Sequence, residues 1–297
     1  MLLKHFVHPT QPALYEIKRD SGRCFLRSPA KASVEKDFYT IKSEKGEKHY
    51  NVEIALGKIE TKNAPTVQKL IESGVNSICE EERAFLANFF AIQIHRTRVM
   101  RSFYDINYQR FLNSGEALKF ISQNRKQLES KFAPKEIEQL ENRIKNGDRL
   151  KEDKNFFVKH GLAPSSPRFA HAVNQMHWKI MTPKSIDSHF VIGDAPVAVR
   201  RRGHLTDPYF VGIERADLGA EMYFPLSYNK LLIASWERSR KNQFKVSPMR
   251  VTELNKIAIV SSFESVFSPS KDDSIIDLVK KLSHIRVQPP PFEIGKD

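Results

Sequence analysis

The stretch Phe190-Val191-Ile192-Gly193-Asp194-Ala195-Pro196-Val197 guides the interpretation of the whole chain. Its three leading apolar residues predict a short buried strand, and the Gly and Pro that follow predict a turn. The turn presents one acidic side chain, Asp194, at the end of the strand. Sheets often carry binding residues where buried strands end. Asp194 is therefore the first candidate site residue.

Strand-like stretches occur toward both ends of the chain, and a helical stretch lies between them. Runs of β-branched and aromatic residues, bounded by turn residues such as Asp20-Ser21-Gly22, predict strands. These strands are expected at residues 13–17, 23–26, 38–41, 190–192, 222–224 and 231–234. We therefore expect an α+β fold in which short N-terminal strands, a helical middle, and C-terminal strands and helices pack as one core of sheet plus helices.

Helix boundaries are predicted from capping residues and from the spacing of apolar residues. Ser77 is a suitable N-cap for a helix that begins near Glu80 and is expected to continue to Leu112. Another helix is expected from Pro167 to Met181, because Pro is favoured in a first turn. Further helices are expected to begin at Asn51 and to cover residues 249–267 and 274–282.

Composition predicts a single domain over residues 1–297, of which 40% are hydrophobic. Residues 114–160 are rich in Lys, Glu, Asn and Gln and predict an exposed helical arm, with a helix start at Pro134. No apolar run approaches the roughly 20 residues of a membrane helix, and the first residues lack the apolar segment of a signal peptide. The two cysteines are not paired in sequence. These features predict a cytoplasmic protein without a membrane partner, and they do not indicate its oligomeric state.

Basic residues exceed acidic ones by 13 (48 against 35), and this charge attracts polyanions. Two basic clusters stand out. They are Arg200, Arg201 and Arg202 in one, and Arg238, Arg240 and Lys241, near Trp236 and Phe244, in the other. Basic residues interleaved with aromatic ones suit single-stranded nucleic acid. Nucleic acid is therefore a candidate partner, although exposed loops beside core strands have the same composition.

An arginine falls within the apolar face of the helix expected at residues 80–112. At about 100° per residue, Arg96 shares that face with apolar side chains on both sides. A buried guanidinium without a partner costs several kcal/mol, so Arg96 needs a carboxylate or carbonyl acceptors. Glu60 and Asp194 are the candidates. A structural ion pair and a catalytic pair both meet this need, and we favour the structural one.

Acidic and basic side chains together supply the candidate catalytic residues. Glu53 and Glu60 are seven residues apart on one expected helix, so they share a face about 10 Å apart along the axis. With Asp194 they could hold Mg²⁺ through oxygen ligands. Arg96 and Arg101 could bind an acidic substrate. These five residues form the candidate catalytic set.

Common catalytic and cofactor motifs do not occur in the sequence. The ten histidines lack the spacing of a helical metal site, and there is no glycine-rich phosphate loop or Gly-x-Ser-x-Gly elbow. His171, Gln175 and Trp178 could line a pocket from one face of the expected 167–181 helix, although such a row more often contacts a neighbouring helix. No cofactor other than Mg²⁺ is indicated.

Six short motifs spread along the chain carry a family resemblance. They are Leu3-Lys4-His5-Phe6, Lys36-Asp37-Phe38-Tyr39, Glu53 with Ile59-Glu60, Gln93 through Arg96-Thr97 to Arg101, Phe190 to Val197, and Phe224-Pro225-Leu226-Ser227. In order and spacing the chain resembles the DUF4238 family, a domain of unknown function, over essentially its whole length. The resemblance implies a shared fold. It implies no activity, because the family has no established one.

The chain differs from the family pattern at two places. Members usually open with His-His-Tyr-Val-Pro-Gln-Phe-Tyr-Leu, and here the resemblance begins with the Leu-x-x-Phe end of that motif. If the histidine pair is functional, we expect this chain to lack that function, to be truncated, or to have its start placed too late in the sequence. Gly193 and Ala195 also replace the usual Ser and Asn beside Asp194. Two polar groups are thereby absent from the expected site, which weakens a catalytic role for Asp194.

Two functions remain as alternatives. The first is an intracellular nucleic-acid-binding protein or metal-assisted nuclease, linked to defence or mobile elements, which the net charge and the acidic residues favour. The second is a non-catalytic interaction or structural module whose Arg–carboxylate network only supports the fold. The first function would be favoured if one cavity brought together Glu53, Glu60, Arg96 and Asp194.

Overall fold

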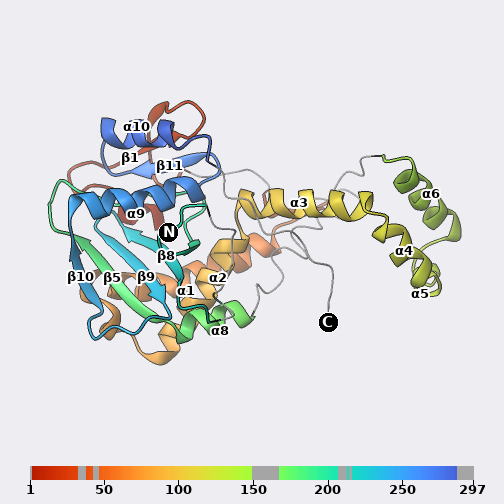
Figure 1. The fold of residues 1–297 in the computed structure, drawn as a ribbon, viewed down its shortest axis with the longest axis horizontal. Coiled ribbons are helices and arrows are strands. Elements are labelled where there is room, and N and C mark those ends of the chain that lie inside the picture. Colours follow the sequence, from red (N-terminus) through yellow and green to blue (C-terminus); the bar gives the residue numbers. More distant parts are fainter. Residues whose placement is uncertain are drawn as a thin grey trace.

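The computed structural model describes residues 2–32, 38–42, 47–148, 167–206, 213 and 216–285. Its helices and strands confirm the α+β class. The strands form two main sheets and a two-stranded ribbon. Figure 1 shows a body of strands and helices, from which one helix leads to a smaller group of helices.

The smaller main sheet brings together segments from both ends of the chain. Its strand order is β2-β1-β11-β6, and all of its pairs are antiparallel. The strands are β1 (Leu14–Lys18), β2 (Cys24–Arg27), β6 (Ile192–Gly193) and β11 (Ser265–Ser268). The strands predicted at residues 13–17 and 23–26 are confirmed as β1 and β2, which form an antiparallel hairpin. Asp194 follows β6 directly, so it lies at the edge strand of this sheet.

The larger sheet has the order β10-β5-β9-β8-β7. Its strands are β5 (His177–Pro183), β7 (Ala198–Arg201), β8 (Ala220–Ser227), β9 (Lys230–Ser235) and β10 (Gln243–Val246). Only β10 and β5 pair in parallel. Every residue of β8 is buried, as expected for a strand covered on both faces. A separate ribbon joins β3 (Ile41–Lys42) to β4 (Lys48–His49).

Helices cover both faces of the larger sheet. The helices of the body are α1 (Asn51–Ser73), α2 (Glu80–His95), α3 (Arg98–Asn113), α8 (Pro167–Gln175), α9 (Pro248–Ser261) and α10 (Asp273–Lys281), with the 3-10 helices η1 (Leu2–Phe6) and η2 (Val75–Ser77). Of these, α10 lies beside β1 of the smaller sheet (Figure 1). Side chains alternate along β9. Leu232 and Ala234 join α2 and α8 in the main core, whereas Leu231 and Ile233 pack with Leu254 of α9.

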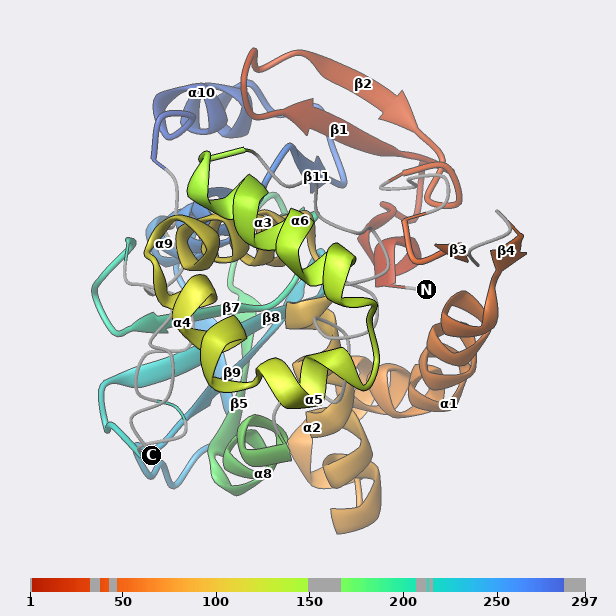
Figure 2. The same ribbon diagram turned by 90° about the vertical axis from the view of Figure 1, so that its right-hand side faces the viewer.

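Three short helices, α4 (Glu116–Gln123), α5 (Arg125–Glu129) and α6 (Pro134–Lys145), follow α3 at its far end. Figure 2 shows them in front of the body. They share a small apolar cluster made of Leu112, Ala117, Ile121, Ile137 and Ile144. Residues 149–160 of the predicted arm lie outside the described residues. No helix within the described ranges is long and apolar enough to cross a membrane.

The helix predicted from Pro167 to Met181 is wrong in its second half. Residues His177–Pro183 form β5, which pairs with β9 and β10. Apolar side chains at helical spacing suggested a longer helix, but Trp178 and Ile180 also fit a period of two. Pairing with two neighbouring strands favours the strand over the helix, because it satisfies the main-chain N–H and C=O groups of a buried segment.

The helix predicted from residue 80 to residue 112 is two helices, α2 and α3. Arg96 ends the first, and Thr97 is the N-cap of the second. The Thr97 Oγ1 accepts a hydrogen bond from the Met100 N–H at 3.2 Å. Thr is a favoured N-cap residue because its hydroxyl satisfies a first-turn N–H. This break places Arg96 at a helix junction rather than in the middle of an apolar face.

Other predicted boundaries also differ. The strand predicted at residues 190–192 is β6, which covers only Ile192–Gly193. The N-cap of α2 is Cys79, whereas Ser77 ends η2. The helix predicted at 249–267 stops at Ser261, and its last residues belong to β11. The strand predicted at 38–41 begins only at Ile41.

Candidate functional site

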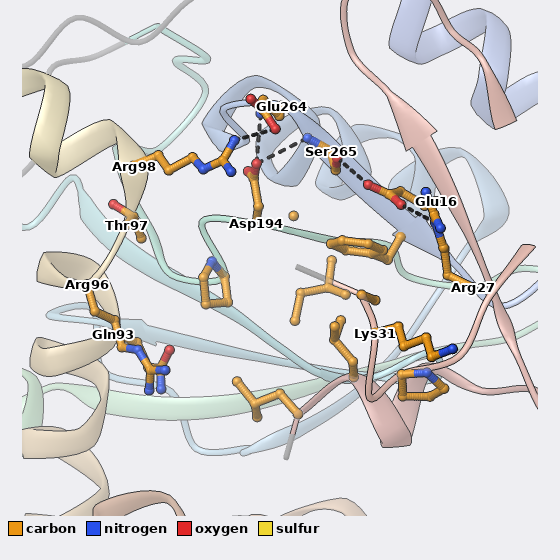
Figure 3. Close-up of a pocket in the computed structure, with 18 of the residues that line it drawn as sticks. Glu16, Arg27, Lys31, Gln93, Arg96, Thr97, Arg98, Asp194, Glu264 and Ser265 are labelled. Atoms are coloured by element: carbon orange, nitrogen blue, oxygen red, sulfur yellow. Dashed lines mark hydrogen bonds and ion pairs between the residues drawn. The ribbon is translucent and has the colours of Figure 1, made fainter. Parts of the chain in front are cut away.

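A cavity of about 770 Å³ is lined by η1, the smaller sheet and the junction of α2 with α3. We call it the central cavity. In Figure 3, Gln93 and Arg96 enter from the helix junction, and Arg27 and Lys31 lie on the opposite side. Glu60, Arg96 and Asp194 all line it. Three of the four residues whose convergence would support a site are thus brought together.

The Arg96 guanidinium is held between α1 and Tyr39. Its Nη1 donates to the Glu60 Oε1, and its Nε donates to the Tyr39 hydroxyl at 3.4 Å. The Tyr39 hydroxyl donates in turn to the Arg96 carbonyl at 2.6 Å. Burial alone would lower the pKa of Arg96, but Tyr39 and Glu60 outweigh it and raise that pKa. Glu60, and not Asp194, is the partner that the sequence predicted Arg96 to need.

The half-buried carboxylate of Asp194 holds the turn that precedes β11. Its Oδ1 accepts from the main-chain N–H of Phe263 at 2.7 Å, and its Oδ2 accepts from those of Glu264 at 2.7 Å and Ser265 at 3.1 Å. Burial raises the pKa of Asp194, while these three donors act in the opposite direction. The geometry is that of a structural anchor in the cavity wall.

Other charges around the central cavity pair with one another. Arg98 pairs with Glu264. Glu16 lies 2.7 Å from the Lys18 Nζ and 3.0 Å from the Arg27 Nε. Burial alone would raise the pKa of Glu16, but the hydrogen bond from Lys18 and its neighbours outweigh it, so that pKa lies below its usual range. These pairs stabilise the lining without a ligand.

Two lysines and one amide of the lining lack such partners. Lys4 and Lys31 are exposed, and neither forms an ion pair with another described residue. Gln93 is only 5% exposed, yet its amide makes no hydrogen bond within the described part of the chain. The amide atoms themselves are not fully enclosed, so the amide is open to the space of the central cavity.

Glu53 and Arg101 do not line the central cavity. The Glu53 Oε1 accepts from the Thr40 Oγ1 at 3.3 Å, and the Arg101 Cζ lies 5.1 Å from the centre of the Phe38 ring. Among the described residues, no three His, Cys, Asp or Glu side chains gather in a way that could hold a metal ion. The Mg²⁺ ligand set expected from the sequence is therefore not assembled.

A second cavity, of about 330 Å³, lies beside α8, β5 and residues 239–242. We call it the basic pocket. Its lining contains four cations, Arg83, Lys179, Arg240 and Lys241, together with His177, and none of its described lining residues is acidic. Arg240 and Lys241 are exposed and form no ion pair with a described residue. Two residues predicted to bind nucleic acid therefore lie in this pocket.

Arg83 is oriented in the basic pocket by main-chain carbonyls. Its Nε donates to the Asn174 carbonyl at 2.9 Å, its Nη2 donates to the Met176 carbonyl at 2.5 Å, and its Cζ lies 4.2 Å from the centre of the Trp178 ring. Burial lowers the pKa of Arg83, and burial and neighbouring cations lower that of His177. Of the four cations, Lys179 pairs with Glu237 at 3.8 Å, whereas Arg83, Arg240 and Lys241 form no ion pair with a described residue. Positive charge of this kind attracts anions.

The predicted cluster at residues 200–202 is used within the fold. Arg200 is 1% exposed and donates to main-chain carbonyls and a serine hydroxyl. Arg201 pairs with Asp217 at 2.7 Å, and Arg202 pairs with Glu221 at 2.9 Å. The charge of this cluster is thereby offset. The second predicted cluster, at residues 238–241, remains exposed apart from a half-buried serine.

Comparison with known proteins agrees with the resemblance seen in the sequence. A family model described as "Protein of unknown function (DUF4238)" matches residues 1–272. The chain belongs to the DUF4238 family. No curated protein and no solved structure matches it.

The DUF4238 motifs gather around the central cavity. All of them except the one at residues 224–227 contribute lining residues. These are Leu3, Lys4, Phe38, Tyr39, Glu60, Gln93, Arg96, Thr97, Ile192, Gly193, Asp194 and Pro196. The stretches through which this chain resembles the DUF4238 family therefore meet at one place in the fold.

Gly193, one of the two departures from the DUF4238 pattern, has a steric reason. A Cβ atom at this position would lie 1.9 Å from the Ser262 Oγ, which donates to the Ala258 carbonyl. The Ser that usually precedes the Asp in DUF4238 proteins does not fit here while Ser262 keeps this position. A hydroxyl supplied from residue 262 thus occupies the space beside Asp194.

Sequence reasoning missed several of these residues as site residues. Gln93 was noted only as part of a motif, and Arg83 resembles an exposed residue in the first turns of a helix. Lys179 could have been found from its position between Trp178 and Ile180, if the segment had been assigned as a strand. That Lys4 and Lys31 form no ion pair with another described residue depends on the contacts of residues distant in sequence, and no local pattern indicates it.

Proposed function

We propose that this DUF4238 protein binds single-stranded nucleic acid at the basic pocket. The observation that carries the proposal is the lining of four cations without an acidic residue. Cations that contact the phosphates of a strand release condensed counterions, which is the main source of affinity for nucleic acid. Arg238 and Lys245 are exposed next to the pocket in sequence and extend its positive charge.

The proposal is for binding and assigns no reaction. A metal-assisted nuclease would need acidic ligands other than the set of Glu53, Glu60 and Asp194, which the described residues do not bring together. The alternative, a purely structural or interaction module, accounts for the Arg96–Glu60 pair. It gives no reason for the three cations of the basic pocket that form no ion pair with a described residue, which are Arg83, Arg240 and Lys241.

Charge reversal at Arg240 and Lys241 tests the proposal. Both side chains are exposed, so R240E/K241E is expected to fold normally. Fluorescence anisotropy with a labelled single strand of about 12 nucleotides measures affinity. The double variant is expected to bind at least about tenfold more weakly at low salt, because phosphate contacts are replaced by repulsion.

A matched control separates the pocket from net charge. K119E/K135E makes the same change in charge at exposed lysines of α4 and α6. It is expected to change the affinity by less than about twofold, since charges farther away than a Debye length are screened. Equal losses in both variants would show that only net charge matters and would refute binding at the basic pocket.

A further inference from the structure

The central cavity contains a polar group that the fold itself does not use. Gln93 lies on α2 and lines the cavity. The residue as a whole is 5% exposed, its amide atoms are open to the cavity, and the amide has no hydrogen-bond partner among the described residues. Its neighbours are already engaged, Arg96 with Glu60 and Thr97 with the first turn of α3. The amide can therefore offer one acceptor and two donors to a molecule in the cavity.

Among the described residues, the lining of the central cavity also carries an excess of two positive charges, six cations less four carboxylates. The cations are Lys4, Lys18, Arg27, Lys31, Arg96 and Arg98, and the carboxylates are Glu16, Glu60, Asp194 and Glu264. Internal pairs involve every one of these cations except Lys4 and Lys31. These two exposed ammonium groups favour an anion that carries about two charges.

Apolar side chains also line the central cavity. The lining includes Leu2, Leu3, Phe38, Ile192 and Phe267. In Figure 3, Gln93 lies on one side and Lys31 on the other. A ligand that reaches both must have an extended body between a hydrogen-bonding edge and an anionic group. The volume of about 770 Å³ falls within the range of roughly 300–1,000 Å³ typical of sites for small organic ligands.

We propose that the central cavity is a second binding site, separate from the basic pocket, and that it takes a nucleoside monophosphate. The Gln93 amide pairs with the edge of the base, for which a side-chain amide has the right alternation of donor and acceptor. Lys4 and Lys31 bind the phosphate, whose two charges match the excess on the lining. The apolar and aromatic side chains contact the base and the sugar. This inference does not depend on nucleic-acid binding at the basic pocket.

Isothermal titration calorimetry with defined probes tests the ligand class. The probes are the four common ribonucleoside monophosphates, the matching nucleosides and inorganic phosphate. At least one monophosphate is expected to bind wild type at least tenfold more tightly than both its nucleoside and inorganic phosphate. Inorganic phosphate that binds as tightly as every nucleotide, or no binding by any probe at millimolar concentration, would overturn the proposal.

Two variants test the residues. Gln93→Leu replaces the amide with an apolar group of similar volume, so the melting temperature is expected to stay the same or rise while nucleotide affinity falls at least tenfold. A merely structural glutamine would instead lower the melting temperature. K4A/K31A removes two exposed lysines and is expected to weaken binding of the monophosphate but not of the nucleoside. K119A/K135A, which removes two exposed lysines elsewhere, is the matched control.

The location of the ligand is tested with R240E/K241E. This variant alters the basic pocket and is expected to bind the nucleotide as wild type does. Loss of nucleotide binding in R240E/K241E would place the ligand in the basic pocket and overturn the proposal. Unchanged affinity in both Gln93→Leu and K4A/K31A would overturn it as well.

Discussion

Asp194 and Glu60 are two carboxylates that line the central cavity, and their surroundings differ. Glu60 pairs with the guanidinium of Arg96, whereas Asp194 accepts hydrogen bonds from three consecutive main-chain N–H groups. Asp194 thereby ties the turn after α9 to β6. Loss of its carboxylate would leave main-chain donors without an acceptor, and unsatisfied buried donors are costly.

Asp194→Asn is expected to lower the free energy of unfolding by about 2 kcal/mol. One carboxylate oxygen becomes an amide nitrogen, which cannot accept, and the charge that strengthens the remaining bonds is lost. Urea unfolding followed by circular dichroism measures the change. Asp277→Asn is the control, because that side chain is 77% exposed beside Lys280; a change below about 0.5 kcal/mol is expected there. Equal stability of Asp194→Asn and wild type would contradict the anchoring role.

His95 is expected to make the fold sensitive to acid. Burial lowers the pKa of His95 from 6.5 to about 4. Between these values the unfolded chain binds more protons than the folded one, so stability falls as the pH decreases from 6.5 toward 4. His5 has the same shift, to about 4. In thermal melts, His95→Gln should lose less stability than wild type between about pH 7 and about pH 4.5. Parallel curves for the two proteins would refute this assignment.

At the scale of elements, the junction of α2 and α3 determines where Gln93 and Arg96 point. The junction is held by Thr97, which caps α3 through the Met100 N–H and donates to the Ile94 carbonyl at 3.0 Å. Both helices therefore begin or end at the wall of the central cavity. A continuous helix would carry these side chains on a different path.

Thr97→Ala is expected to lower the free energy of unfolding by about 1 kcal/mol, the usual value of an N-cap hydroxyl. Thr97→Ser keeps the hydroxyl and should lose much less. Urea unfolding of the three proteins under the same conditions measures both changes. If Thr97→Ser lost as much as Thr97→Ala, packing of the methyl group and not capping would hold the junction.

Local signals predicted some elements and failed for others. The hairpin of β1 and β2 and the helix α10 follow from turn residues and caps, which act over a few residues. β5 could not be predicted in this way, because its apolar residues fit both a helix and a strand. The choice depends on pairing with β9 and β10, which lie about 40–70 residues further along the chain.

The candidate site, like the fold, could be predicted only in part from the sequence. A helical arginine in an apolar stretch requires an acceptor, so the need of Arg96 for a carboxylate followed from the sequence. The choice of Glu60 over Asp194 did not, because it depends on the main-chain donors that occupy Asp194. Two of the four cations of the basic pocket, Arg240 and Lys241, could be predicted from the sequence as binding residues. Arg83 reaches it from a helix far away in sequence.

At the scale of the whole molecule, a net charge of +13 is distributed unevenly. The cluster at residues 200–202 is offset by carboxylates or buried, and the central cavity keeps an excess of two charges. The basic pocket has four cations and no acidic lining residue among those described. Net charge alone therefore does not indicate the binding surface. The position of cations without an acidic partner indicates it instead. That position favours the basic pocket as the binding site of a polyanion.

The salt dependence of single-strand binding tests nucleic-acid recognition at the basic pocket most directly. If the four pocket cations each contact a phosphate, the logarithm of the association constant should fall with the logarithm of salt concentration with a slope of about −2.8, or about −0.7 for each contact. R240E/K241E should reduce the magnitude of this slope by about 1.4, and K119E/K135E should leave it unchanged. Absence of binding by wild type at low salt, or one slope for all three proteins, would contradict the proposal.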